Sequence, residues 1–584
     1  MIRIGGGSAF FIDSALAVPQ LLGAGVDYII LDYLAEGAMG LMGRMRRADP
    51  EGGFPADFLD VHIGPLLPQI AQTGTKIIAN AGAVNPAGLA KMLRSKIAEL
   101  ALNLKVVCIA GDCLMHRLAD FADTRDMFTG GAFPTKGVTS ANAYLGAFPI
   151  AHALGQGADI IITGRVVDSA LALGPLIHEF GWGPDDLDSL AGGTLAGHLI
   201  ECGAQATGGT FTDWRAVEGW AIIGSPIAEC HADGRCIITK PEGTGGLVSF
   251  GTVAEQLLYE VSDPAAYLVP DVACDFTRVT LEEIGKDRVL VWGAIGKPAP
   301  DTLKACATWD DGWRGIAYQP VIGPAAAEKA RKQAAALFER GRAMLRARGL
   351  ADWRRTICVL IGAQDPKAEE VIAKLVVEHE DALAAGMFVR EQFSAISAMA
   401  PGTSVSFGAQ VQPCMGLISF LVPKGEVVAT VDGDVFVSTP HQERGSRGGG
   451  CPPDAAARSP TPLRRGIENA KSHYPSLKEE GLTIFDLAYT RSGEKGETIN
   501  IAVIARRPDY LPTLRAALTD AAIALWFADL APSRVIIHEV PGIHALNIVL
   551  EGALPGGINA SQRLDPAAKS VGQRLLGFAV GLRN

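Results

Sequence analysis

The sequence is poor in charged residues and has no paired cysteine motif. Only 20% of its 584 residues are charged, below the ~25% that is usual for soluble domains. None of its ten cysteines belongs to a CxxC pair, which argues against the common structural zinc sites and a thioredoxin-like redox pair. Unpaired thiols in apolar surroundings are typical of a reducing compartment. We therefore expect a cytoplasmic protein without a metal site.

Basic clusters and membrane-spanning segments are also missing. Lys and Arg number 52 against 63 Asp and Glu, a net charge of −11, and no basic block is interleaved with aromatics, so nucleic acid is not an expected partner. Asp13 interrupts the first apolar run, unlike in a signal peptide. The longest uncharged stretch, 392–423, contains Gln410, Gln412 and several serines, so we expect no membrane span and no membrane partner.

Several common enzyme motifs are absent as well. The sequence contains no GxSxG elbow, which argues against an α/β-hydrolase triad. The glycine-rich segment 5–8 matches neither GxGxxG nor GxxxxGK[ST], so neither a Rossmann dinucleotide site nor a P-loop is indicated. No remaining feature requires a redox cofactor, and we expect none.

Glycine and apolar residues, by contrast, are abundant. The chain has 68 Gly and is 48% hydrophobic, whereas Gly usually makes up ~7% of a sequence. This hydrophobicity excludes disorder across the whole chain. At ~100 to 200 residues per domain, the length predicts two to four domains.

The first part of the chain alternates between short β-branched runs and longer stretches rich in Ala and Leu. Such alternation predicts βαβ units, and hence a mostly parallel sheet with helices on both faces. The fold class is therefore α/β. The predicted strands are 2–4, 27–31, 76–79, 105–110 and 159–163, and a predicted helix spans 86–100.

Composition divides the chain into four regions. One α/β lobe is expected at 1–213 and a second α/β lobe at 214–438, the latter with helices at 325–348 and near 368–377. Region 439–480 is dominated by Gly, Pro, Ser and Arg, which predicts a flexible linker. The order of strands and helices in 481–584 predicts a small α+β domain of ferredoxin-like type.

Polar residues follow each of the predicted strands of the first lobe. In open parallel sheets the carboxyl ends of the strands form the ligand crevice, because helix N-termini and free backbone amides meet there. This convergence is the strongest functional signal in the sequence. We expect substrate binding by Gly6, Gly7, Ser8, Asn80, Asn85, Arg165 and Asp168, and acid/base chemistry by Asp32 and Asp112.

Several of these residues have simpler interpretations. Asn85 precedes Pro86, and capping of a helix explains it better than a binding site does. Arg165 and Asp168 could equally form a local ion pair, and Asp168 could cap the next helix. Turn geometry explains the glycine-rich segment 242–246 about as well as phosphate binding does.

Two further places carry charged residues. His198 and Glu201 lie three residues apart and could act as acid and base or contribute to a metal site, although a buried hydrogen-bonded pair is the commoner explanation. Lys495 lies in segment 491–500, where charges alternate with glycines between two predicted strands. A solvated hairpin tip is the simpler interpretation of that segment, and substrate binding by Lys495 is the alternative that we retain.

Long segments of the chain resemble one known family. The sequence is similar to the acyclic terpene utilisation protein A (AtuA) family, long described as a domain of unknown function, in NAGAVNPAGLA, GRVVDSALALGPLIHEFGW, LAGGTLAGHLIECGAQATGG and KPEGTGGLVSFGTVAEQLLYE. RSGEKGETINIAVIAR and VPGIHALNIVLEGAL resemble the ferredoxin-like domain that follows it in that family. The family's C-terminal loop is typically Ser-Gly-Asp-Lys-Gly-Asp, and here Glu494 and Glu497 replace the two Asp residues.

The resemblance implies a cytosolic catabolic protein, associated with the breakdown of branched acyclic terpenoids through acyl-CoA intermediates. It implies no particular reaction. From the strand-end residues we hypothesise a lyase of hydratase type acting on a small carboxylated or CoA-linked acyl substrate. Asp32 and Asp112 would move protons, Arg165 would bind a carboxylate and Asn80 would donate to a carbonyl.

The alternative is a non-catalytic accessory or binding subunit of an acyl-CoA or terpenoid degradation complex. Charged residues at the ends of buried strands favour the enzyme, because an accessory protein has no need of them. The apolar composition further predicts a homo-oligomer.

Overall fold

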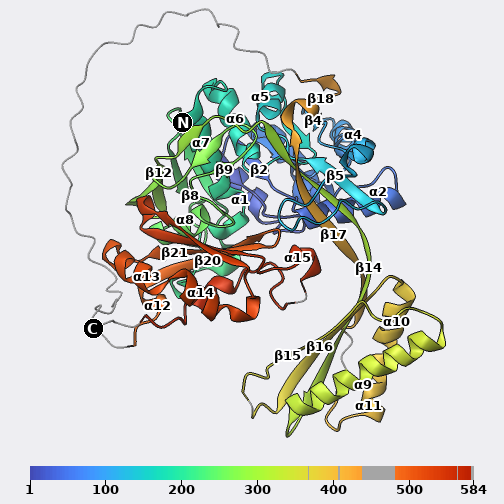
Figure 1. The fold of residues 1–584 in the computed structure, drawn as a ribbon. Coiled ribbons are helices and arrows are strands. Elements are labelled where there is room, and N and C mark those ends of the chain that lie inside the picture. The colour runs from blue at the N-terminus through green and yellow to red at the C-terminus, as the bar shows by residue number, and fades with distance from the viewer. Residues whose placement is uncertain (366, 405–407, 437–480, 562, 581–584) are drawn as a thin grey trace, which may run out of the picture.

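The computed structural model describes residues 1–365, 367–404, 408–436, 481–561 and 563–580 (Figure 1). The predicted linker, 439–480, lies outside these residues. The largest element is an 11-stranded sheet in the order β11-β12-β8-β7-β1-β2-β3-β6-β4-β18-β19. Its five central strands are parallel and coincide with the predicted strands: β1 (Ile2–Gly6), β2 (Tyr28–Leu31), β3 (Lys76–Ala79), β6 (Ile160–Thr163) and β4 (Val106–Ala110).

Helices cover both faces of this parallel core, as predicted. Because successive residues of a strand point to opposite faces, Ile30 packs into one hydrophobic cluster while its neighbour Ile29 packs into the other. The first cluster is completed by α5 (Phe148–Gly155), α6 (Ala170–Phe180), α7 (Leu187–Ile200) and α8 (Phe250–Leu257). The second is completed by α1 (Ala17–Gly23), α2 (Glu36–Ala48), α3 (Leu67–Thr73) and α4 (Pro86–Glu99).

The expectation of a mostly parallel sheet is not confirmed, because both edges of this sheet are antiparallel. A short turn between two strands makes an antiparallel pair, whereas a parallel pair needs a long crossover such as a helix. Strands from beyond the expected lobe boundary at 213 extend this same sheet. The added strands are β7 (Ile227–Cys230), β8 (Cys236–Thr239), β12 (Arg288–Trp292) and β11 (Thr280–Gly285) on one side, and β18 (Thr430–Val431) and β19 (Asp434–Val435) on the other.

A second, antiparallel sheet is built around the 21-residue strand β14 (Thr302–Ile322). At one end β14 pairs with β5 (Val138–Ala143), and at the other with β16 (Glu370–His379), which pairs with β15 (Arg355–Ile361). Strand β17 (Gln410–Pro423) pairs with β14 along most of its length. The end of the sheet that holds β15 and β16 projects from the body of the molecule (Figure 1). The projecting end carries α9 (Ala326–Ala347), α10 (Ala382–Glu391) and α11 (Ala395–Ala398).

The prediction of a helix near 368–377 is wrong, since Glu370–His379 form strand β16. Alternate side chains, Val371, Ala373, Leu375 and Val377, pack into the cluster beneath α9 and α10. That period of two fits a strand. The long helix predicted at 325–348 is confirmed as α9. A small third sheet holds β9 (Tyr267–Leu268), β10 (Ala273–Asp275) and β13 (Ile295–Lys297).

The C-terminal region folds as an α+β domain with its own core. Its sheet is antiparallel in the order β20-β21-β23-β22, and it packs against the first region (Figure 1). Across that contact, Asn500 Nδ2 donates to Leu258 O at 2.7 Å. The elements are α12 (Ile484–Leu487), β20 (Ala488–Lys495), β21 (Thr498–Ala505), α13 (Leu511–Ala517), α14 (Asp520–Trp526), β22 (Arg534–Val540), β23 (Ala545–Glu551), α15 (Gly557–Ala560) and α16 (Val571–Leu575).

Within the described ranges, no helix has both the length and the apolar character that crossing a lipid bilayer requires.

Candidate functional site

The ends of β2 and β3 are joined by a hydrogen bond between Asp32 and Asn80. Asn80 Nδ2 donates to Asp32 Oδ1 at 2.6 Å, and Asn80 Oδ1 accepts from the backbone of Tyr33 at 2.7 Å. Burial raises the pKa of the Asp32 carboxyl well above its usual range; Asp168 raises it further, whereas Arg165 and Asn80 lower it. Asp32 therefore holds a proton at a higher pH than an exposed Asp does.

Asp112, at the end of β4, supports the backbone at the end of β6. Its Oδ2 accepts from the amide of Arg165 at 2.9 Å and from Asn142 Nδ2 at 2.7 Å. A side chain at Gly164 would lie 2.3 Å from Asp112 Oδ1, so only glycine fits there. Burial raises the pKa of Asp112 to about 6, against the hydrogen bonds that lower it. Asp112 thus fixes the position of Arg165.

Arg165 is the most deeply placed cation of the site, with 3% of its surface exposed. Its Nη1 donates to Asp168 Oδ1 at 2.8 Å, and its guanidinium lies 4.2 Å from the ring centroid of Tyr144. The Nε atom is buried and has no hydrogen-bond partner. Burial lowers the pKa of Arg165, but the surrounding groups, Tyr144 and Asp168 foremost, outweigh this and raise it, so the side chain stays charged.

A second cation reaches the same place from β14. Lys304 Nζ donates to Glu36 Oε1 at 2.9 Å, and Tyr144 donates its hydroxyl to the same oxygen at 2.7 Å. Glu36 is the first residue of α2. Burial raises the pKa of Glu36, but Lys304 and other cations lower it by more, to well below its usual range. Glu36 is therefore an ionised carboxylate.

The C-terminal domain supplies a third cation, Lys495. It ends β20 at the hairpin with β21, and its Nζ lies 2.8 Å from Glu260 Oε2. Lys569 of the same domain lies 2.6 Å from the other oxygen of Glu260. Burial, then Glu36 and Glu260, raise the pKa of the neighbouring Glu494 to about 8. Both domains therefore bring charge to one place.

A cavity of about 320 Å³ lies among these groups, at the lower end of the ~300 to 1,000 Å³ that ligand pockets usually span. It opens where the strand ends meet the C-terminal hairpin, and we take it as the candidate functional site. Its polar lining consists of Glu36, Tyr144, Arg165, Asp168, Ser262, Tyr267, Thr302, Lys304 and Lys495.

His198 and Glu201 form a buried pair and do not line this cavity. His198 Nδ1 lies 3.3 Å from Glu201 Oε1, and its Nε2 lies 3.1 Å from Leu257 O. Glu201 Oε2 has no partner. Burial raises the pKa of Glu201 to about 7, with His198 lowering it and Asp168 raising it. The contacts agree with the simpler expectation for this pair, a buried hydrogen-bonded couple, and an acid/base role for it stays a prediction.

Four residues predicted to bind a substrate are instead engaged within the fold. The amides of Gly6 and Gly7 donate to carbonyl oxygens at 2.9 and 2.8 Å, so they are not free to hold an anion. Ser8 Oγ donates to Asp32 O at 2.9 Å. Asn85 caps α4, because its Oδ1 accepts from Gly88 N at 3.1 Å. These contacts account for Gly6, Gly7, Ser8 and Asn85 within the fold, and a binding role for them stays a prediction.

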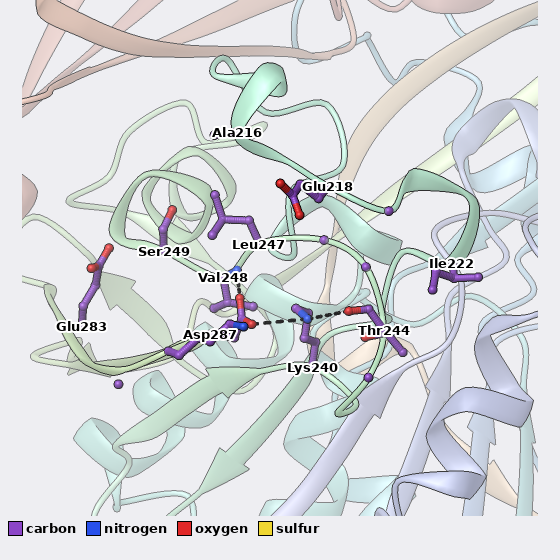
Figure 2. Close-up of a pocket in the computed structure, with 16 residues that line it drawn as sticks. Ala216, Glu218, Ile222, Lys240, Thr244, Leu247, Val248, Ser249, Glu283 and Asp287 are labelled. Atoms are coloured by element: carbon purple, nitrogen blue, oxygen red, sulfur yellow. Dashed lines mark hydrogen bonds and ion pairs between the residues drawn. The ribbon is translucent and has the colours of Figure 1, made fainter. Parts of the chain in front are cut away.

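A larger hollow, of about 660 Å³, lies beside the glycine-rich segment 242–246 (Figure 2). Figure 2 shows Lys240 between Asp287 and Thr244; its Nζ lies 3.4 Å from Asp287 Oδ2 and donates to Thr244 O at 3.0 Å. The amide of Val248 donates to Asp287 Oδ1 at 3.0 Å. The amides of Gly245 and Gly246 donate to carbonyl oxygens, as in a turn, and phosphate binding by the segment stays the alternative prediction.

Sequence reasoning missed three residues that line the cavity: Glu36, Tyr144 and Lys304. Glu36 carried a signal, since it lies one helical turn after Asp32. Lys304 carried none, because its partner Glu36 is 268 residues away in the chain. Among the described residues, no three His, Cys, Asp or Glu side chains form a group that could hold a metal ion.

Comparison with known proteins identifies the family. The family described as "Acyclic terpene utilisation family protein AtuA" matches residues 2–432, and the "AtuA ferredoxin-like domain" matches residues 482–581. The second match shows that the C-terminal domain is ferredoxin-like, as predicted. No curated protein and no solved structure matches the chain. Since the first match spans most of the sequence, the chain belongs to the acyclic terpene utilisation (AtuA) family.

Proposed function

We propose that this protein is a lyase of hydratase type that acts on a small carboxylated or CoA-linked branched acyl substrate. One observation carries the proposal. The cavity at the strand ends is lined by Arg165, Lys304 and Lys495 together with Glu36 and Asp168. Such a set can both hold an anionic or polarised oxygen and move protons.

Hydration of an unsaturated acyl group adds a hydroxyl to one carbon and a proton to the next. A base must take a proton from water, an acid must give a proton to carbon, and a cation must stabilise the enolate-like oxygen that forms between these steps. Arg165 is suited to hold that oxygen, because it lines the cavity and stays charged.

We assign the proton transfers to Asp168 and Asp32. Asp168 lines the cavity and pairs with Arg165. The charge on Asp168 helps to raise the pKa of the buried Asp32, which makes Asp32 a proton reservoir behind it. Asp112 does not line the cavity and contacts the Arg165 backbone, so we assign it a positioning role.

The test is turnover by the purified full chain with unsaturated free acids and with unsaturated acyl-CoAs. We expect hydration, and a loss of about 100-fold or more in Asp32→Asn and in Asp168→Asn, the range typical of a lost acid or base. Asp233→Asn is the matched control, since the Asp233 side chain is 52% exposed and pairs with Arg235. Full turnover in Asp32→Asn and Asp168→Asn would show that these roles are wrong.

The accessory-subunit alternative gives a different result in the same preparation. In that case the isolated chain turns over none of these substrates, and affinity purification recovers it in a stable complex with an acyl-CoA-processing enzyme.

A further inference from the structure

The cavity lining combines ionic and apolar side chains. Alongside the cations and carboxylates, Met127, Phe128, Leu268, Val269, Leu303 and Leu421 supply much of the remaining lining. Four of these apolar side chains are strongly exposed: Met127 by 48%, Phe128 by 43%, Leu268 by 62% and Leu421 by 52%. An apolar ligand tail would cover surface that the fold itself leaves in water.

The ionic side chains of the lining can donate hydrogen bonds to a ligand. Arg165 lines the cavity, and a guanidinium presents its donors as a planar fork that suits a carboxylate. Lys304 and Lys495 are bound to Glu36 and Glu260 respectively. An ammonium carries three donors, so each of these lysines can still contact a ligand.

Cations outnumber carboxylates in and directly behind the lining. Arg165, Lys304 and Lys495 line the cavity with Glu36 and Asp168, and Glu260 behind them is shared between Lys495 and Lys569, which gives four cations against three carboxylates. Buried charge is costly unless it is paired. A ligand with a single negative charge would balance the lining.

The size of the cavity limits what it can hold. About 320 Å³ is the lower end of the ~300 to 1,000 Å³ that enclose drug-sized ligands. An acyl group of moderate length fits this space, whereas the nucleotide of coenzyme A would have to lie outside it.

We propose that the cavity binds its substrate as the free acid: a monocarboxylate held by Arg165, with its apolar tail along Leu421 and Phe128. The inference rests on the proposed function for the choice of site, and it selects the carboxylate over the CoA thioester. The carboxylate supplies the one negative charge that the lining lacks, and the tail covers the exposed apolar side chains.

Calorimetric binding of saturated probes to the full chain tests this inference, because saturated acyl groups cannot be hydrated. We expect hexanoate to bind, and both hexanamide and hexanoyl-CoA to bind at least about tenfold more weakly, the size of one lost charge-assisted hydrogen bond. Arg165→Gln is expected to weaken the binding of hexanoate by a similar factor and to leave the binding of hexanamide unchanged.

A second variant probes the apolar lining and keeps every charged group of the cavity in place. Leu421→Trp fills part of the cavity from an exposed position. It should therefore weaken the binding of octanoate, which has the longer tail, more than the binding of butanoate. Leu525→Trp is the matched control, since Leu525 is 79% exposed and lies outside the cavity. Equal effects of Leu421→Trp on the two acids would contradict the proposed tail position.

The outcomes separate the two proposals. Hexanoyl-CoA or hexanamide binding as tightly as hexanoate overturns the free-acid inference, even if unsaturated acyl groups are hydrated. Hexanoate binding as expected, without hydration of any unsaturated acid or thioester, overturns the proposed function and leaves the binding inference standing.

Discussion

At the scale of single residues, burial sets the protonation of several carboxyl groups. It raises the pKa of Asp112 to about 6, of Glu201 to about 7, and of Glu255 and Glu494 to about 8. None of these four carboxyl groups belongs to the cavity lining; Asp112 holds the backbone of Arg165, and Glu255 lies by Thr212 where the C-terminal domain docks. Their raised pKa values therefore bear on stability.

The same shifts predict how stability depends on pH. Unfolded Asp and Glu titrate near ~4, so the folded chain binds more protons than the unfolded chain between about pH 4 and 8. The free energy of unfolding therefore falls as pH rises through this window. We expect a melting temperature several degrees higher at about pH 6 than at about pH 8, measured by calorimetry. A melting temperature that rises from pH 6 to pH 8 would contradict these shifts.

Glu494→Gln isolates one of these groups. The neutral amide avoids the cost of an ionised carboxylate beside Glu36 and Glu260. Because one pKa unit corresponds to ~1.4 kcal/mol, we expect the variant to melt a few degrees higher than the parent at about pH 8 and to lose part of its pH dependence. The matched control is Glu99→Gln, whose parent side chain is 66% exposed.

At the scale of elements, glycines allow the strands and helices of the site to approach one another. A Cβ atom on Gly6 would lie 1.8 Å from Ile200 O at the end of α7, whereas one on Gly23 would meet nothing within 4 Å. The glycine-rich end of β1 thus serves packing, which explains why it lacks a phosphate-binding motif.

Gly6→Ala should therefore destabilise the fold. Overpacking typically costs ~1 to 3 kcal/mol, and here the obstructing atom belongs to the backbone of α7. Denaturant unfolding should show this loss for Gly6→Ala and no loss for Gly23→Ala. Equal stability of the two variants would contradict the close approach of β1 and α7.

The β20–β21 hairpin is held over the cavity by Glu260, which contacts both Lys495 and Lys569. Glu260 has a backbone φ of 58°, a left-handed conformation that is uncommon for residues other than glycine. Such conformations persist where the surrounding structure fixes them. Glu260 therefore links the C-terminal domain to the site.

Glu260→Gln should loosen the hairpin. A partly exposed ion pair contributes up to ~1 kcal/mol, so amide hydrogen exchange at 493–498 should become about fivefold faster. Glu539→Gln is the matched control, because it breaks the exposed pair with Arg515 inside the same domain. Unchanged exchange in Glu260→Gln would show that other contacts hold the hairpin.

Local patterns in the sequence predict which residues follow the parallel strands, but they do not predict that Lys304 reaches the cavity. Five apolar runs predicted the parallel strands, and parallel strands carry Asp32, Asn80, Asp112, Arg165 and Asp168 to one edge by necessity. Lys304 lies on a long strand whose pairing no local pattern indicates. The antiparallel edges also escaped prediction, because short apolar runs do not reveal the direction of their neighbours.

At the scale of the whole molecule, the site exists only because two domains meet. Asn547 is fully buried, and its Nδ2 donates to Val261 O at 2.7 Å and Ser262 O at 2.9 Å. Arg506 of the C-terminal domain donates from both terminal nitrogens to Asp213. Specific polar contacts of this kind fix one orientation of the domains and thereby place Lys495 in the cavity.

These contacts predict that the two domains unfold together. Asn547→Ala leaves the buried Val261 carbonyl and the partly buried Ser262 carbonyl without this donor, at a cost of ~1 to 3 kcal/mol. Calorimetry should show one transition for the parent protein and a lower melting temperature for the variant. Asn103→Ala, in an exposed loop, should leave the melting temperature unchanged. Two separate transitions in the parent protein would contradict the coupling of the domains.

The central claim is that the cavity between the strand ends and the C-terminal hairpin is the functional site. A crystal structure of the full chain soaked with an unsaturated monocarboxylate tests this claim most directly. We predict density for the ligand in the cavity, with its carboxylate against Arg165 and its tail toward Leu421. Density confined to the hollow beside Lys240 (Figure 2), with the strand-end cavity empty, would contradict it.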